Sequence, residues 1–301
     1  MTLAVTGGTG FVGQAVLAEA VRRGMPVRAL ARREQEPREG IAWVRGDLAD
    51  TAALADLVAG TDAVVHIAGV INSDAAGFQS GNVAGTEAVI EAARSAGVRR
   101  FVAVSSLAAR EPMLSAYGRS KRLAEEAVQT SGLDWTIVRP PTVYGPHDRE
   151  VLDLFRAARW GVVPMPAGGS ASIIHADDLA RLLLALVPSG AEVSERIFEP
   201  DDGRPGGWPH RELAQALGAA VGRKVWGPPV GRRMLSLAAR ADRVLRGGKA
   251  KLTLDRVGYM SHPDWVSRPE RAVPAELWAP QIDTAAGLAL TARWYREQGW
   301  L

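Results

Sequence analysis

The sequence predicts an α/β fold in which a doubly wound parallel sheet is joined to a smaller, mainly helical C-terminal cap. Three observations predict it. Short apolar runs alternate with helix-length amphipathic stretches over residues 1–190, a glycine-rich turn follows the first run, and beyond residue 200 Pro- and Gly-rich pieces separate helical patterns. Strand–helix alternation at this spacing favours parallel strands joined by right-handed crossovers.

The expected strands are apolar runs that are short, nearly continuous and rich in Val, Ile or Ala, as in sheets covered by helices on both faces. Helices are expected between them, with Gly or Pro at most junctions. Ligands of such a sheet bind beyond the carboxyl ends of its strands. The strands are Leu3–Val5, Val27–Leu30, Ala63–Ile67, Phe101–Val104 and Trp135–Val138; the helices lie near 12–23, 51–58, 83–95 and 118–130, and in the cap near 210–221, 233–246 and 284–298.

The glycine-rich turn after the first strand is typical of a dinucleotide-binding (Rossmann) loop. Gly7 permits the tight turn, Gly10 lets the backbone approach a pyrophosphate, and Gly13 lets the helix pack closely on the strand. The helix that follows offers backbone N–H groups and a favourable dipole to phosphates. An ordinary glycine-rich turn is the alternative, but the strand–turn–helix context favours the binding loop. The full stretch is Thr6-Gly7-Gly8-Thr9-Gly10-Phe11-Val12-Gly13.

The end of the second strand bears on which dinucleotide binds. An NAD site usually has a carboxylate there, about 20 residues past the glycines, to hold the ribose 2′-hydroxyl. Here Arg32 and Arg33 follow the strand, and the first acid is Glu34. Two guanidinium groups suit a 2′-phosphate. We therefore expect NADP(H) to be preferred, with NAD(H) still open and a solvated basic pair as the alternative.

Tyr117 and Lys121 are four residues apart, so a helix would carry both on one face. A phenol is a poor acid or base at neutral pH, but a nearby ammonium favours the phenolate and lowers the phenol pKa. The pair could then move a proton at an oxygen while hydride moves at its carbon. Ser105 and Ser106 end the strand Phe101–Val104, where a hydroxyl can hold the same oxygen, although capping or a turn would also explain them.

In family order, these motifs resemble those of extended short-chain dehydrogenases/reductases of the NAD(P)-dependent epimerase/dehydratase kind. The resemblance covers nearly the whole chain. Its pieces are Thr6–Gly13, Gly46-Asp47-Leu48, His66-Ile67-Ala68-Gly69, Asn82-Val83-Ala84-Gly85-Thr86, Ser105-Ser106, Tyr117 to Lys121, Arg139-Pro140-Pro141-Thr142-Val143-Tyr144-Gly145-Pro146, Ile174-His175-Ala176-Asp177-Asp178, Trp294-Tyr295 and Gly299-Trp300-Leu301.

The resemblance implies three catalytic residues. Ser106 would hold the substrate oxygen, with Ser105 as the alternative. Tyr117 would be the acid/base, and Lys121 would bind the nicotinamide ribose and tune Tyr117. Asn82 would order backbone or a water near the site.

The resemblance also implies further cofactor contacts. Asp47 and Leu48 would contact the adenine, Ala68 and Gly69 would pass beside the cofactor, and Pro140 and Val143 would frame the nicotinamide pocket. The cofactor-binding set is thus Gly7, Thr9, Gly10, Phe11, Val12, Gly13, Arg32, Arg33, Asp47, Leu48, Ala68, Gly69, Lys121, Pro140 and Val143. The dinucleotide-binding domain would comprise 1–146 and 170–200, and the substrate-binding cap 147–169 and 201–301.

Two departures from the family pattern bear on substrate. Sugar-nucleotide epimerases carry an Asn shortly after the arginine that corresponds to Arg139, where this chain has Pro140-Pro141-Thr142. Dehydratases carry Thr-Asp-Glu where this chain has Ser106-Leu107-Ala108. The motifs are closer to those of the dihydroflavonol reductase and 3β-hydroxysteroid dehydrogenase branch.

We therefore expect an NADP(H)-dependent enzyme that reduces a ketone or aldehyde of a fairly apolar small molecule, or oxidises the alcohol. A nucleotide-sugar 4-epimerase with tightly held NAD is the first alternative. The second is a non-catalytic NADP(H)-binding accessory subunit, which would not require Ser106, Tyr117 and Lys121. A homodimer packed through the helix that bears Tyr117 is expected by family analogy.

Composition excludes several other classes. The 301 residues are 47% hydrophobic and 23% charged, without an apolar run long enough to span a bilayer. There is no cysteine, which excludes disulfides and thiolate sites, and residues 1–10 lack the pattern of a signal peptide, so we expect a cytoplasmic protein. The net charge of +3 is too small to favour a nucleic-acid partner. No metal site is expected, because the histidines lack ligand spacing and His66 reads as a hydrogen-bonded core residue.

Positive charge is concentrated between Arg223 and Lys251, where nine basic residues, Lys249 among them, face one acid, Asp242. Apolar residues recur at helical spacing from Met234 to Leu245 within it. Two interpretations stay open. The segment is a cap helix that packs its apolar face on the core, or residues 232–246 form an amphipathic helix for peripheral contact with an anionic membrane or for drawing in an acidic substrate.

Overall fold

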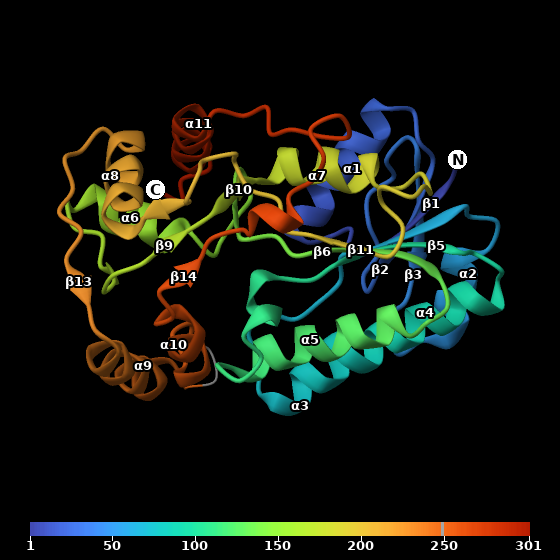
Figure 1. Cartoon of the computed structure of the whole chain (residues 1–301), viewed down its shortest axis with the longest axis horizontal. Helices are drawn as coiled ribbons and strands as arrows, with labels where there is room; N and C mark the ends of the chain where they lie inside the picture. The colour runs from blue at the N-terminus through green and yellow to red at the C-terminus, as the bar shows by residue number, and fades with distance from the viewer. Residues whose placement is uncertain (248–249) are drawn as a thin grey trace. The chain divides into compact units, whose positions relative to one another are not determined.

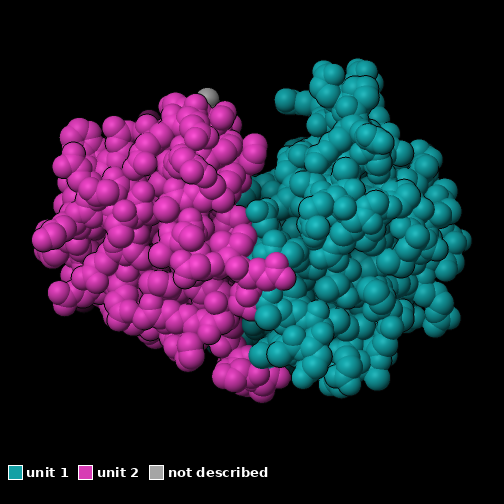
Figure 2. Space-filling view, turned by 90° about the horizontal axis from the view of Figure 1, so that it is seen from above, with its two compact units in different colours: residues 1–140, 176–199, 271–279 teal, residues 141–175, 200–270, 280–301 magenta. Residues whose placement is uncertain are grey.

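The computed structural model describes residues 1–247 and 250–301, so Lys249 of the basic segment lies outside the described residues. The chain forms two compact units, coloured separately in Figure 2. The first contains Met1–Pro140, Ala176–Glu199 and Arg271–Ala279, and the second contains Pro141–His175, Pro200–Glu270 and Pro280–Leu301. These bounds assign 141–146, 170–175, 200 and 271–279 differently from the predicted domains. The division into cofactor-binding and substrate-binding parts stays a prediction.

The first unit is built on a seven-stranded sheet whose paired strands all run parallel, with the order β11-β6-β5-β4-β1-β2-β3 (Figure 1). This confirms the predicted doubly wound sheet. Two strands were not predicted. One of them, β3, lies at the sheet edge with Ile41 and Val44 as its buried residues, and β11 has three residues. The strands are β1 (Leu3–Thr6), β2 (Val27–Ala31), β3 (Ile41–Arg45), β4 (Ala63–His66), β5 (Arg100–Val104), β6 (Asp134–Val138) and β11 (Arg196–Phe198).

Helices cover both faces of this sheet, which explains why its central strands are buried throughout. Helix α1 packs against α7 on one face, and α2, α4 and α5 pack in succession on the other (Figure 1). A π-helical turn, Gln79–Ala84, leads from the short α3 into α4. The helices are α1 (Phe11–Arg22), α2 (Thr51–Val58), α3 (Ala75–Phe78), α4 (Gly85–Ser95), α5 (Ala116–Gln129) and α7 (Ala176–Ala185), with a 3-10 turn at Leu107–Arg110.

The second unit is mainly helical, as predicted, and its strands are only two or three residues long. Aliphatic and aromatic side chains share its core, where the rings of Phe155 and Tyr295 meet edge to face. Helices α6 and α10 were not predicted. The elements are β7 (Thr142–Tyr144), α6 (Leu152–Arg159), β8 (Met165–Pro166), β9 (Ser170–Ala171), β10 (Ile173–His175), β12 (Trp208–Pro209), α8 (His210–Ala220), β13 (Pro229–Val230), α9 (Arg232–Arg246), α10 (Leu254–Met260), β14 (Asp264–Trp265), the 3-10 turn Pro269–Arg271 and α11 (Thr284–Glu297).

Helix α9 corrects one expectation. Of its fifteen residues, Ala239 alone is buried, and the apolar side chains of Met234, Leu237, Val244 and Leu245 are exposed. The interpretation in which α9 packs this apolar face on a core is therefore wrong. Among the described residues, no helix has the length and apolar character needed to cross a bilayer.

Candidate active site

The glycine-rich turn leads from β1 into α1, and its shape depends on missing side chains. Gly7 has φ of +75°, and a Cβ at this position would lie 2.6 Å from the backbone nitrogen of Ala68. A Cβ on Gly13 would lie 2.0 Å from the carbonyl oxygen of Gly7. Without a side chain at Gly7, the turn can pack against the backbone that follows β4. Without one at Gly13, the turn can pack against the first turn of α1. Larger residues at either position would force this cradle open.

The N-terminus of α1 faces outward from this turn. Thr9 and Gly10 are exposed, while Phe11 and Val12, the first helical residues, are half-buried. Gly10 provides no side-chain cap, and the first turn of α1 contains no acidic residue. The positive end of the helix dipole is therefore not offset by a side chain of the helix, an arrangement that suits a pyrophosphate.

A second feature of the cofactor side is a pocket of about 370 Å³ at the ends of β2 and β3. Arg32 lines it together with Arg45, which the sequence reasoning missed because β3 was not predicted. Neither guanidinium has an ion pair within the described part of the chain, and Arg33 is exposed but does not line the pocket. Two arginines at one pocket wall provide the charge that a 2′-phosphate requires. The full lining is Arg32, Arg45, Gly46, Asp47 and Asp50.

The acids of this pocket are engaged locally. Asp50 caps α2 by accepting from the N–H of Ala53, and the Asp47 carboxylate accepts from the N–H of Ala49. Leu48 packs against the core, and a Cβ on Gly85 would lie 2.6 Å from its Cδ1. The structure thus places Asp47 at the pocket and Leu48 beneath it. Their contact with adenine stays a prediction.

Tyr117 and Lys121 lie on α5, as predicted from their spacing. The Ser115 hydroxyl starts the helix by accepting from the N–H of Gly118 at 2.9 Å. The Tyr117 ring contacts the ring of Phe78 with a centroid separation of 5.8 Å. Helical geometry then places the ammonium of Lys121 one turn further along the same face.

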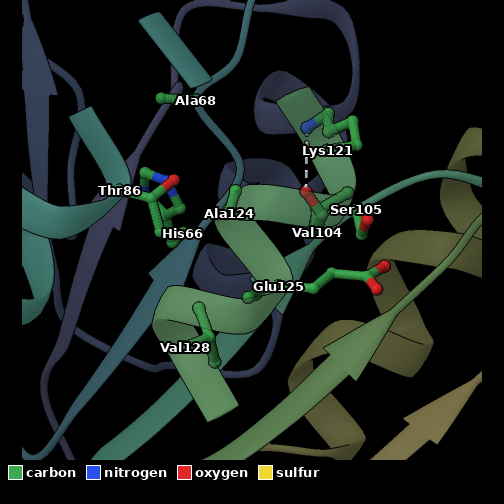
Figure 3. Close-up of a pocket in the computed structure, with 10 residues that line it drawn as sticks. His66, Ala68, Thr86, Val104, Ser105, Lys121, Ala124, Glu125 and Val128 are labelled. Carbon is green, nitrogen blue, oxygen red and sulfur yellow. Dashed lines mark hydrogen bonds between the residues drawn. The ribbon is translucent and has the colours of Figure 1, made fainter. Parts of the chain in front are cut away.

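Lys121 is buried, and its Nζ donates to the carbonyl oxygen of Val104 at 3.2 Å (Figure 3). Burial lowers the pKa of Lys121 from 10.5 to about 8, and the negative charge of Glu125 opposes this shift. A Cβ on Gly69 would lie 3.0 Å from Nζ, so the glycine provides the room that the ammonium needs. Lys121 therefore stays mainly protonated at neutral pH while being able to change charge within the alkaline range of ordinary assays.

The two serines after β5 have different environments. Ser106 caps the 3-10 turn Leu107–Arg110, where its Oγ accepts from the N–H of Ala108 at 3.2 Å. The Oγ of Ser105 is buried, has no hydrogen-bond partner among the described residues, and faces a cavity that Lys121 also lines. Ser106 retains its hydroxyl proton for another acceptor, so the structure leaves both serines available to hold a substrate oxygen.

His66 is the hydrogen-bonded core histidine that the sequence predicts. Its Nδ1 lies 2.7 Å from the hydroxyl of Thr6 and its Nε2 lies 3.0 Å from the hydroxyl of Thr86. The Thr86 hydroxyl donates to the Asn82 carbonyl, so it accepts from Nε2–H, and Nδ1 accepts from Thr6. Burial, and then the charge of Lys121, lowers the pKa of His66 to about 3. The neutral ring thus links β1 and β4 to the first turn of α4.

Asn82 lies in the π-helical turn and holds the loop after β4 against α5. Its Oδ1 accepts from the N–H of Val70 at 2.6 Å, and its Nδ2 donates to the carbonyl of Val70 and to the hydroxyl of Ser120. The side chain therefore orders the backbone beside Gly69 and Lys121, in agreement with the role that the resemblance implies.

A buried set of charges behind α5 was not predicted. The guanidinium of Arg139 pairs with both carboxylate oxygens of Glu125, at 2.8 and 2.6 Å, and with Glu199 at 3.3 Å. Glu199 also pairs with Arg110, at the end of the 3-10 turn that Ser106 caps. Glu125 lies four residues beyond Lys121, so extension of the Tyr117–Lys121 spacing by one turn could have found it. Burial of both partners makes these pairs sensitive to loss of either one.

The two residues expected at the nicotinamide pocket follow β6. Pro140 accepts a hydrogen bond from the N–H of Leu107 at 3.1 Å, which places it beside the serines. Val143 lies in β7 of the second unit and pairs with Ile174 of β10. Their contact with the cofactor stays a prediction. No cluster of metal-ligating side chains is present in the described ranges.

Comparisons with known proteins identify the family of this chain. A family described as NAD(P)H-binding matches residues 7–187. The chain is 35% identical to a ceramide reductase from Caulobacter vibrioides, over 99% of this chain and 96% of that protein, and 31% identical to a 2-alkyl-3-oxoalkanoate reductase from Stenotrophomonas maltophilia, over 96% and 97%. A solved UDP-glucose 4-epimerase from Thermus thermophilus, in complex with NAD, shares the fold with a TM-score of 0.71 at 22% identity, over 98% of this chain and 99% of that chain.

The family match, the two reductases and the shared fold all indicate a nicotinamide-dinucleotide-dependent protein. The glycine cradle and the uncapped end of α1 fit a dinucleotide, and the chain binds NAD(P)(H) as its family does. The chain therefore belongs to the NAD(P)H-binding family and is an NAD(P)-dependent enzyme of the extended short-chain dehydrogenase/reductase type.

Proposed function

We propose that this enzyme is an NADP(H)-dependent reductase of a ketone or aldehyde group on a fairly apolar small molecule, able to run in the alcohol-oxidising direction as well. The observation that carries the proposal is the buried ammonium of Lys121, which lies one helical turn from Tyr117 and lines a cavity together with Ser105. A buried cation on the same helix face as the phenol favours the phenolate, and this assists proton transfer from Tyr117 to an alkoxide oxygen. An accessory subunit that only binds the cofactor would use Lys121 to hold the ribose, but it would not need the phenol of Tyr117 one helical turn away.

The nicotinamide, when bound, would supply the hydride. In reduction Tyr117 gives its phenolic proton to the developing alkoxide oxygen, and Ser106 donates a hydrogen bond to that oxygen, with Ser105 as the alternative donor. Lys121 favours the phenolate that remains and binds the ribose. Asn82 keeps the backbone beside Lys121 in place.

Arg32 and Arg45 support NADP(H) over NAD(H). Both line the pocket at the ends of β2 and β3, and no carboxylate directly follows β2, where one would repel a 2′-phosphate. Arg33, one residue further on, is the second predicted contact. We propose that the ribose end of the cofactor binds in this pocket, with Asp47 on the adenine side.

The names of two relatives support an apolar substrate. They are named a ceramide reductase and a 2-alkyl-3-oxoalkanoate reductase, and both named compounds carry alkyl chains. The departures from the epimerase pattern at Pro140-Pro141-Thr142 agree with this class. We propose a substrate in which a carbonyl group is flanked by a long alkyl chain. The cytoplasmic location and the homodimer through α5 remain predictions, and the dimer can be checked by analytical ultracentrifugation.

The test is reduction of a 2-alkyl-3-oxoalkanoate by the purified enzyme, followed by the loss of NADPH absorbance. We expect turnover with NADPH, slower turnover with NADH, and turnover lower by roughly a hundredfold or more with the Tyr117→Phe variant. Conversion of UDP-glucose to UDP-galactose without added cofactor would instead establish the epimerase alternative. Tight NADPH binding with no turnover across a panel of long-chain ketones and aldehydes would establish the accessory-subunit alternative.

A further inference from the structure

Helix α9 presents an apolar stripe to solvent. Met234, Leu237, Val244 and Leu245 are 65, 63, 85 and 82% exposed, and with Ala241 they recur at intervals of three and four residues. This spacing places them on one side of the helix. Single exposed apolar residues are ordinary on protein surfaces, but a continuous stripe along a helix marks an interaction site.

The opposite side of α9 attaches it to the protein. Ala239 is the buried residue of the helix, and Asp242 is partly buried. The Asp242 carboxylate accepts from the N–H groups of Lys251 and Leu252, and α9 packs beside α10 within the same unit (Figure 1). Helix α9 is therefore held in place by this side, and the exposed stripe lies on the side that faces away from these contacts.

Basic side chains border the stripe. Arg233 and Arg240 lie one turn before Leu237 and Val244 respectively, and both are exposed. Asp242, the acidic residue of α9, forms an ion pair with Arg246. The other arginines in the described part of α9 have no ion pair; they are Arg232, Arg233, Arg240 and Arg243.

The first turn of α9 adds a second argument. Arg232 and Arg233 stand at the positive end of the helix dipole, where a cation costs helix stability. Stability of the helix therefore does not explain them, whereas attraction to an external anionic surface does. The segment Arg223–Lys251 has nine basic residues against one acid, while the whole chain has a net charge of only +3.

We propose that α9 docks on the surface of an anionic lipid bilayer, with the stripe of Met234, Leu237, Ala241, Val244 and Leu245 in the acyl boundary and the arginines at the headgroups. An apolar stripe with a basic border is the pattern of helices that lie in the membrane interface. Negative lipid headgroups complement the unpaired arginines, and a bilayer accepts apolar side chains that water does not. The proposal concerns binding alone and is independent of the substrate.

The test is co-sedimentation of the full chain with vesicles of phosphatidylcholine, alone or mixed with phosphatidylglycerol, at low and high salt. We expect binding to the mixed vesicles at low salt and a large loss at high salt, because salt screens exposed charges. Arg233→Ala with Arg240→Ala is expected to weaken binding on the order of tenfold or more. Leu237→Glu with Val244→Glu is expected to abolish it at either salt concentration.

The matched control is Arg293→Ala with Arg296→Ala, which removes two exposed arginines from α11. It should bind vesicles as the wild type does. The substituted side chains are all exposed, so each variant should keep the wild-type circular dichroism spectrum and thermal midpoint. If the glutamate variant does not, the vesicle binding of the Arg233→Ala with Arg240→Ala variant is the result that tests the proposal.

Three results would overturn the proposal. The first is no binding of the wild type to mixed vesicles at low salt. The second is an equal loss in the control pair. The third is a wild type that does not bind vesicles but forms a dimer in vesicle-free solution, where Leu237→Glu with Val244→Glu dissociates the dimer. That result would assign the stripe to contact with a second copy of the chain.

Discussion

Lys121 on α5 and the arginines of α9 lie in opposite environments. On α5, Lys121 is buried, donates to the Val104 carbonyl and has its pKa lowered to about 8. On α9, Arg233 and Arg240 are exposed to water. Burial changes the proton affinity of a cation, whereas an exposed cation keeps its proton and acts through a field that salt screens. The environment of a cation, more than its presence on a helix, indicates what it can do.

The buried side of this comparison is tested most strongly by Tyr117→Phe. The ring contact with Phe78 is kept and the transferable proton is lost. We expect turnover to fall by roughly a hundredfold to ten-thousandfold with cofactor affinity unchanged, measured by steady-state kinetics and by fluorescence titration of NADPH. Turnover close to that of the wild type would mean that Tyr117 is only a surface residue of α5.

The next prediction compares a buried ion pair with an exposed one. Arg139→Met leaves the buried carboxylate of Glu125 without its arginine and removes one of the two buried arginines that pair with Glu199, and we expect a loss of about 3–5 kcal/mol in the free energy of unfolding. Arg246→Met removes the partner of Asp242 on α9 and should change the unfolding curve little. Urea denaturation of both variants measures the difference. Similar losses for the two would show that burial does not separate these ion pairs.

A third prediction concerns exposed cations that have a specific ligand. Replacement of Arg32 and Arg33 by Ala should weaken NADPH binding by about a hundredfold, or about 3 kcal/mol for two charge-assisted hydrogen bonds, and leave NADH nearly unchanged. Single Ala variants at 32, 33 and 45 then show how much each arginine contributes to NADPH affinity. Because Arg32 and Arg45 line the pocket, we expect each to contribute more than Arg33. Isothermal titration with both cofactors gives the affinities. Tighter binding of NADH than NADPH by the wild type would contradict the assignment.

The last prediction concerns stability in acid. His66 has its pKa lowered from 6.5 to about 3 by burial, so below pH 6.5 the unfolded chain binds a proton that the folded chain does not. Stability contributed by the neutral ring is present above pH 6.5 and is lost as the pH falls toward 3. His66→Asn, which retains hydrogen-bonding atoms, should flatten this dependence in thermal unfolding measured across the range. An unchanged slope would assign the acid sensitivity to other groups.

Continuous apolar runs and glycine spacing made the central sheet and the cofactor turn predictable. Strand β3 was missed although its first four residues, Ile41–Val44, form an apolar run, and Arg45 was missed with it. The pairing of Arg139 with Glu199 joins residues 60 positions apart, and no local pattern carries such a contact. Periodicity also showed that α9 is amphipathic, but it could not show which of its faces the fold leaves uncovered.

Of the active-site residues, Tyr117 and Lys121 were predictable because a fixed helical spacing brings them together. The environments of the serines were not, since capping and burial depend on how the chain turns after β5. The hydrogen-bonded core position of His66 was predictable from the apolar strand around it, whereas its two threonine partners lie 60 and 20 residues away.

The π-helical turn at Gln79–Ala84 has a consequence for how this chain tolerates changes of length. A π-turn holds one residue more than an α-turn, so loss of a single residue there would convert it into regular α-helix. Such a deletion would leave α4 packed on the sheet but rotate the preceding residues by about 100°. The Asn82 amide would then swing away from Val70 and Ser120. A one-residue deletion that the fold can absorb would thus disconnect the loop beside Lys121 from α5.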